Sequence, residues 1–120
     1  MPLVWVVDDD PSILEAIEFV LIDAGYTVRM IMSEHELLSL LHNEIPDVFL
    51  LDILLSGTDG RDIARTLREH ENTKSIPIIM MSADSRALDS CMAIGISACI
   101  KKPFDIGELV QLINTVTRLV

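Results

Sequence analysis

The stretch Leu3-Val4-Trp5-Val6-Val7-Asp8-Asp9-Asp10-Pro11 combines three local signals that decide the fold. Its first five residues form an apolar, valine-rich run, which predicts a strand covered on both faces. Asp10 is a good helix N-cap, and Pro11 suits the first helical position. Apolar residues then recur at helical spacing until Gly25, a typical helix end. The chain is therefore expected to begin with a strand, an acidic loop and a helix.

The same alternation of apolar runs and helical patterns continues to the other end of the sequence. Ser33 and Glu36 form a capping box that opens a second helix through about His42. Five strands alternating with five helices predict one doubly wound α/β domain over residues 1–120, with a parallel sheet between right-handed crossovers. The remaining strands are expected at 27–32, 48–51, 76–81 and 98–101, and the remaining helices around 63–67, at 85–94 and from 105 onward.

The overall charge excludes some classes of partner. The chain has 19 acidic and 9 basic residues, a net charge of −10. Such a balance repels nucleic acid backbones, so we expect no direct nucleic acid binding. The apolar run near the start is far shorter than a membrane span and lacks the flanks of a signal peptide. We therefore expect a cytoplasmic chain that does not enter a membrane.

Cysteine, histidine and methionine carry no site pattern of their own. Cys91 and Cys99 match neither a redox pair nor a zinc framework, and we interpret both as small apolar fillers. The three histidines are expected on solvated helix faces. Strand interiors covered on two sides predict that the methionines lie in the core, namely Met30, Met32, Met80 and Met81.

Polar side chains stand where the expected strands end. Acidic residues follow the first strand, an aspartate ends the third, a hydroxyl follows the fourth and a lysine follows the fifth. In doubly wound sheets ligands bind at the carboxyl ends of the strands, so these groups should converge on one rim. They are Asp8, Asp9, Asp10, Asp52, Ser82 and Lys102.

Such a set of groups suits magnesium and a phosphoryl group. Neighbouring carboxylates repel one another unless a cation lies among them, and hard oxygen ligands favour Mg²⁺, which usually shares its coordination with phosphate. Asp52 could act as a nucleophile and form an acyl phosphate. Ser82 and Lys102 would then bind the phosphoryl oxygens. Successive strand residues point to opposite faces, so we expect Lys102 rather than Lys101 to reach the site.

Taken together, five motifs resemble the receiver domains of response regulators in two-component signalling, the CheY-like superfamily. The resemblance covers the whole chain, and the motifs are specific as a set because they occur in the order and spacing of the family. They are Val6-Val7-Asp8-Asp9-Asp10, Leu51-Asp52, Asp59-Gly60, Ser82-Ala83 and Lys102-Pro103-Phe104.

The resemblance implies a flavodoxin-like fold with strand order 2-1-3-4-5. It also implies phosphorylation of Asp52 by a histidine kinase, a phosphotransfer protein or a small phosphodonor. By position, Asp9 is similar to the direct metal ligand and Asp8 to its companion through water, while the backbone carbonyl of Leu54 occupies the third protein ligand position. Catalysis would be limited to self-catalysed phosphotransfer and autodephosphorylation, without enzymatic turnover.

The other site residues receive roles by the same resemblance. Ser82 matches the hydroxyl that follows the phosphoryl group and switches the domain. Lys102 matches the lysine that pairs with Asp52 and later with the phosphate. Asp10 is then mainly a helix cap, and the Lys102–Pro103 bond is similar to one that family members hold cis.

Three positions depart from the family pattern. Cys99 stands where an aromatic residue usually lies three positions before the lysine, so signal transmission through the face built from the fourth helix, fifth strand and last helix should differ in detail. Ser56 replaces a common proline, which should loosen its loop. Leu54 cannot orient an attacking water, and we expect it to slow spontaneous dephosphorylation.

The last expected helix is apolar around more of its circumference than one buried stripe requires. We therefore expect it to pack on a second copy of the chain or on an output domain. The residues concerned are Leu109, Val110, Leu112, Ile113, Val116, Leu119 and Val120.

Three other functions compete with a phosphorylated receiver. Haloacid-dehalogenase-like phosphatases need an acid two residues after the nucleophile, where this chain has Leu54. A flavodoxin would need a Ser/Thr/Gly-rich phosphate loop after the first strand, which is missing. A pseudo-receiver that binds partners without phosphorylation stays open, because Cys99 replaces the usual aromatic residue.

Overall fold

A five-stranded parallel sheet forms the centre of the molecule. The computed structural model describes residues 2–55, 57–91 and 94–118. The strand order β2-β1-β3-β6-β7 confirms the expected order 2-1-3-4-5, because β4 and β5 belong to a separate small hairpin. The strands of the large sheet are β1 (Leu3–Val7), β2 (Thr27–Ile31), β3 (Val48–Asp52), β6 (Ile78–Ser82) and β7 (Ala98–Lys101).

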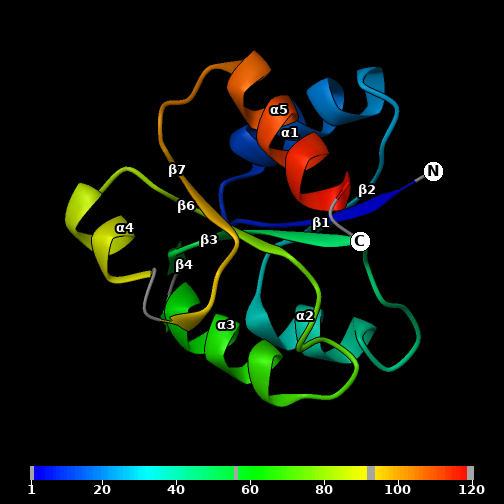
Figure 1. The fold of residues 1–120 in the computed structure, drawn as a ribbon, viewed down its shortest axis with the longest axis vertical. Coiled ribbons are helices and arrows are strands. Elements are labelled where there is room, and N and C mark those ends of the chain that lie inside the picture. Colours follow the sequence, from blue (N-terminus) through cyan, green and yellow to red (C-terminus); the bar gives the residue numbers. More distant parts are fainter. Residues whose placement is uncertain (1, 56, 92–93, 119–120) are drawn as a thin grey trace.

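Helices cover both faces of the sheet (Figure 1). Helices α1 (Pro11–Asp23) and α5 (Ile106–Arg118) pack on one face, where alternate strand residues such as Val4 and Val6 point. Helices α2 (Glu34–Leu40), α3 (Gly60–Glu69) and α4 (Ser85–Cys91) pack on the other face, over Trp5 and Val7. The expected fold is confirmed, with two apolar cores separated by the sheet.

The predicted helix starts are confirmed by their hydrogen bonds. The Asp10 carboxylate accepts the Ser12 amide at 2.9 Å at the start of α1, and Pro11 is the first helical residue. The Ser33 hydroxyl accepts the Glu36 amide at 3.2 Å at the start of α2. Side-chain caps therefore fix where the chain leaves the carboxyl edge of the sheet.

Most boundaries differ from the expectation by one or two residues, as where α2 ends at Leu40 instead of about His42, and three differences bear on the fold. The strand expected from residue 76 begins at Ile78, because the Ile76 amide donates to the Thr73 carbonyl in a turn. Helix α4 ends at Cys91, and residues 92–93 lie outside the described part. The loop after Asp52 contains a short antiparallel pair, β4 (Leu54–Leu55) and β5 (Thr58–Asp59), that was expected only as a turn.

The core predictions for methionine are half right. Met80 and Met81 are fully buried, as predicted. The predictions for Met30 and Met32 were wrong, because 37% and 45% of their surfaces are exposed. Both lie on or just after β2, which is an edge strand and is covered only in part. His35, His42 and His70 are exposed and Cys99 is half-buried, while nothing is described of the Cys91 side chain.

Many of the apolar side chains of helix α5 pack in the core of the molecule. Leu109, Ile113 and Val116 are buried, and Val110 and Leu112 pack at the margin of the same core. Residues 119 and 120, which belong to the apolar set of this helix, lie outside the described part. Among the described residues, no helix is both long and apolar enough to cross a membrane.

Candidate functional site

Four neighbouring strands bring the predicted polar groups to one edge of the sheet. Asp8 follows β1, Asp52 ends β3, Ser82 ends β6 and Lys102 follows β7. These strands are parallel and adjacent, so their carboxyl ends meet. The backbone stays in register beyond the strands, because the Lys102 amide donates to the Ser82 carbonyl at 2.9 Å.

Three carboxylates form the centre of the site. One oxygen each from Asp8, Asp9 and Asp52 lies within 4.8 Å of the others. Asp8 and Asp52 are only 1% and 5% exposed, and Asp9 is half-buried. A cluster of oxygen donors with this much burial fits a hard divalent cation such as Mg²⁺.

Lys102 supplies the positive charge beside these carboxylates. Its Nζ lies 2.7 Å from Asp8 Oδ2 and 3.5 Å from Asp52 Oδ2. The resemblance implied pairing with Asp52, whereas the shorter contact is to Asp8. Lys101 is exposed, and the Lys102–Pro103 peptide is cis, as expected.

Backbone amides orient the buried carboxylates. Asp8 Oδ1 accepts the Asp10 amide at 3.0 Å while its other oxygen binds Lys102, so both oxygens are engaged. The Leu54 amide hydrogen bonds to the Asp52 carboxylate. Leu54, two residues after Asp52, is 58% exposed. The role of the Leu54 carbonyl as a metal ligand stays a prediction.

Burial is the main influence on the acidity of Asp52. It raises the pKa of Asp52, and the negative charge of Asp8 raises it further. The Lys102 charge and the Leu54 amide oppose this effect, and the resulting pKa is about 6. At neutral pH Asp52 is therefore mostly ionised, and the ionised carboxylate is the form that can act as a nucleophile.

Ser82 lies at the end of β6, buried with 1% of its surface exposed. Its hydroxyl oxygen accepts the Asp84 amide at 3.0 Å, which fixes the start of the segment that leads into α4. The structure thus brings Asp8, Asp9 and Asp52 together, with Lys102 paired to Asp8 and Asp52 and Ser82 on the neighbouring strand. Asp10 is exposed and serves as the α1 cap. Their roles in phosphoryl transfer stay predictions.

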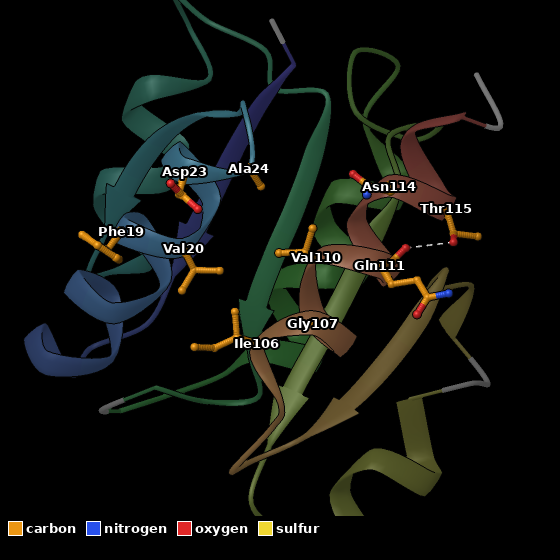
Figure 2. A pocket seen from close by; sticks show the side chains of 10 residues that line it. All are labelled: Phe19, Val20, Asp23, Ala24, Ile106, Gly107, Val110, Gln111, Asn114 and Thr115. Atoms are coloured by element: carbon orange, nitrogen blue, oxygen red, sulfur yellow. Dashed lines mark hydrogen bonds between the residues drawn. The ribbon is translucent and has the colours of Figure 1, made fainter.

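Sequence reasoning missed an apolar groove between α1 and α5. Figure 2 shows α1 side chains such as Phe19 and Val20 opposite Ile106 and Val110 of α5. The groove consists of two adjoining hollows of about 730 and 580 Å³ that share Phe19, Val20 and Ile106. Phe19 is 77% exposed and lies outside the buried stripe of α1. A large aromatic residue off that stripe was the signal in the sequence.

Comparison with known proteins places these features among receiver domains. The family model of the response regulator receiver domain matches residues 4–114. A putative response regulator from Chloroflexus aurantiacus is 34% identical, with 98% of each chain covered and a TM-score of 0.92. Chemotaxis protein CheY4 from Vibrio cholerae is 26% identical over 97% of this chain and 98% of its own, with a TM-score of 0.89.

A third similar structure contains a metal ion. It is the receiver domain of a sensor histidine kinase from Pseudomonas aeruginosa, with a magnesium ion coordinated in its active site cleft. It is 26% identical, covers 98% of both chains and has a TM-score of 0.88.

Proposed function

The chain belongs to the response regulator receiver domain family, and on this premise we propose that it accepts a phosphoryl group on Asp52 and thereby changes its affinity for partners. Receiver domains are signalling domains of two-component systems. The observation that carries the proposal is the cluster of Asp8, Asp9 and Asp52, with the Lys102 ammonium group beside Asp8 and Asp52. We propose that the reaction takes place in the cytoplasm.

Each residue of the site has a role in the proposed reaction. An Asp52 oxygen attacks phosphorus as the bond to the leaving group breaks, and the leaving group keeps the electron pair. Asp8, Asp9 and the Leu54 carbonyl would hold Mg²⁺ with Asp52; the ion would neutralise charge on the phosphoryl oxygens. Lys102 and the Ser82 hydroxyl would stabilise the same oxygens. Hydrolysis of the acyl phosphate by water, which releases inorganic phosphate and restores the Asp52 carboxylate, would be the only turnover.

Intact-protein mass spectrometry tests the proposal directly. After incubation with Mg²⁺ and acetyl phosphate, we expect one phosphoryl adduct on the wild-type chain. The matched sample with EDTA should show none, because the carboxylates then repel the anionic donor. No adduct with acetyl phosphate, phosphoramidate or a panel of histidine kinases would contradict the proposal and favour a pseudo-receiver.

The groove between α1 and α5 supports a histidine kinase or phosphotransfer protein as the partner. Receiver domains of this family interact with such proteins. The groove extends to Lys102 and so reaches the phosphorylation site. The hollow beside Lys102 has mostly apolar walls, and α1 carries acidic side chains without a basic one. We propose that it receives a partner helix with an apolar stripe and basic flanks.

Phe19→Glu is expected to slow phosphotransfer from a histidine kinase about tenfold or more without changing uptake from acetyl phosphate. The matched control is Ile45→Glu, which adds the same charge at an exposed apolar position outside the groove. Rates are measured with a purified kinase that phosphorylates the wild-type chain. Equal slowing by both variants, or by neither, would contradict this docking surface.

Association through α5 with a second copy or an output domain is a separate proposal. Much of the apolar surface of α5 already packs in the core. Among the described residues of this helix, Ile106 is exposed and Val110 and Leu112 are half-buried, and Ile106 and Val110 also line the groove. Sedimentation with and without the phosphoryl group tests it, since an unchanged monomer in both states would exclude a dimer switch for this chain.

Leu54→Asn is expected to accelerate loss of the phosphoryl group several-fold. Leu54 is exposed beside Asp52 and has no group that could orient an attacking water, whereas an asparagine amide could. The decay of the adduct is followed after the donor is removed, with Leu54→Ile as the apolar control. An unchanged decay rate in Leu54→Asn would show that this side chain does not control the lifetime.

A further inference from the structure

The segment after Asp52 folds back on the backbone of the phosphoacceptor. Leu54 and Leu55 pair antiparallel with Asp59 and Thr58, which makes the short hairpin β4–β5. The Gly60 amide closes the neck of this hairpin by donating to the Ile53 carbonyl at 2.6 Å. Helix α3 therefore begins directly against the end of β3.

There is no room for a side chain at position 60. A Cβ atom on Gly60 would lie 2.2 Å from the Asp52 carbonyl oxygen and 2.9 Å from the Ile53 Cα. Both are backbone atoms, and the Ile53 amide is held by the Met81 carbonyl at 2.9 Å. The end of β3 cannot move away without breaking its pairing with β6, so a side chain would displace α3 or the Asp52 peptide.

Core packing and an N-terminal cap also hold helix α3 in place. Ile63 and Leu67 are fully buried beneath the sheet. The Asp59 carboxylate accepts the Arg61 amide at 2.9 Å, and the Arg61 guanidinium contacts the same carboxylate at 2.6 Å. The close approach of Gly60 to Asp52 is therefore enforced by packing and capping together.

We propose that Gly60 is a positioning residue for Asp52, because only glycine lets α3 begin against the Asp52 peptide while the Leu54 amide stays hydrogen-bonded to the Asp52 carboxylate. This inference rests on the function proposed above. The Leu54 amide is hydrogen-bonded to the Asp52 carboxylate, so a shift of the backbone at Leu54 would move this contact. A displaced loop would turn the carboxylate away from the metal-binding pair and from the donor.

Gly60→Ala tests the proposal. In the folded variant we expect the Mg²⁺ dissociation constant to rise, and the rate of phosphorylation by acetyl phosphate at saturating Mg²⁺ to fall, about tenfold or more. Leu67→Ala is the control, because it removes a buried side chain two turns further along the same helix. It should lower the unfolding midpoint while leaving Mg²⁺ affinity unchanged. Mg²⁺ affinity is measured by calorimetric titration at a temperature well below the unfolding midpoint of each variant.

A second pair of variants decides the question should Gly60→Ala fail to fold. Asp59→Ala removes the cap on the first turn of α3, whereas Asp59→Asn keeps one. Weaker Mg²⁺ binding in Asp59→Ala than in Asp59→Asn supports the proposal, and equal binding overturns it. Wild-type affinity and rate in a folded Gly60→Ala, or an equal loss of affinity in Leu67→Ala, also overturn it.

The experiment separates this inference from the proposed function. If the wild-type chain takes up no phosphoryl group, the proposed function fails. The Mg²⁺ titrations still show whether Gly60 positions the Asp52 carboxylate, because they need no phosphoryl donor.

Discussion

Asp52→Asn is expected to abolish the phosphoryl adduct and, at the same time, to make the folded chain more stable. An amide cannot replace the carboxylate as the nucleophile, so uptake from acetyl phosphate should vanish. The stabilisation arises because the carboxylate is buried beside the charge of Asp8, which raises its pKa to about 6. An uncharged side chain of the same shape removes that repulsion.

The stabilisation by Asp52→Asn should depend on pH in a defined direction. The folded-state pKa of Asp52 is above the ordinary value of 3.8, so the folded chain holds this proton more tightly than the unfolded chain. The wild-type chain therefore loses stability as pH rises from about 4 through about 6. A shift of this size corresponds to about 3 kcal/mol, which the variant should gain above pH 7 and lack below pH 4.

Urea denaturation at several pH values measures this difference. Asp10→Asn is the matched control, because Asp10 is exposed and asparagine also caps helices. It should change neither stability nor uptake appreciably. Saturating Mg²⁺ should stabilise the wild-type chain more than Asp52→Asn, since the variant lacks one ligand. Equal stability of the two chains at pH 7.5, or an adduct on Asp52→Asn, would contradict these expectations.

The sequence was sufficient to predict the residues at the carboxyl ends of the strands. Apolar runs fix where strands end, and parallel pairing requires those ends to meet, so Asp8, Asp52, Ser82 and Lys102 could be placed together without coordinates. What could not be predicted is which carboxylate Lys102 approaches more closely. That depends on side-chain geometry across β1, β3 and β7, which no local pattern encodes.

The missed features depend on contacts between elements that are distant or irregular. Each strand of the β4–β5 hairpin is only two residues long, so the sequence has no periodic pattern that would predict it. The close approach of Gly60 to Asp52 arises only when α3 packs against the end of β3. The exposure of Met30 follows from the place of β2 at the sheet edge. The sequence pattern indicated strand identity but not how completely each strand is covered.

Because Lys102 is in a buried ion pair, removing its charge should lower both the free energy of unfolding and the rate of phosphorylation. Lys102→Met keeps the apolar stem that lines the groove and removes the ammonium group that contacts Asp8 and Asp52. Leaving buried carboxylates without a partner typically costs about 3 to 5 kcal/mol, and losing one group that stabilises a transferring phosphoryl slows the reaction about 100-fold or more. We expect both losses at neutral pH.

Two comparisons separate the charge of Lys102 from its packing. Lys101→Met removes the same charge from the exposed neighbouring residue and should change little. Asp8→Asn combined with Lys102→Met removes both members of the closer ion pair. The double variant should recover most of the lost stability, because no carboxylate at position 8 is left unpaired, yet it should stay unable to accept a phosphoryl group.

If Lys102→Met alone unfolds at the wild-type urea midpoint at pH 7.5, the ion pair with Asp8 contributes nothing to the stability of the fold. If it also phosphorylates at the wild-type rate, Lys102 does not stabilise the phosphoryl group.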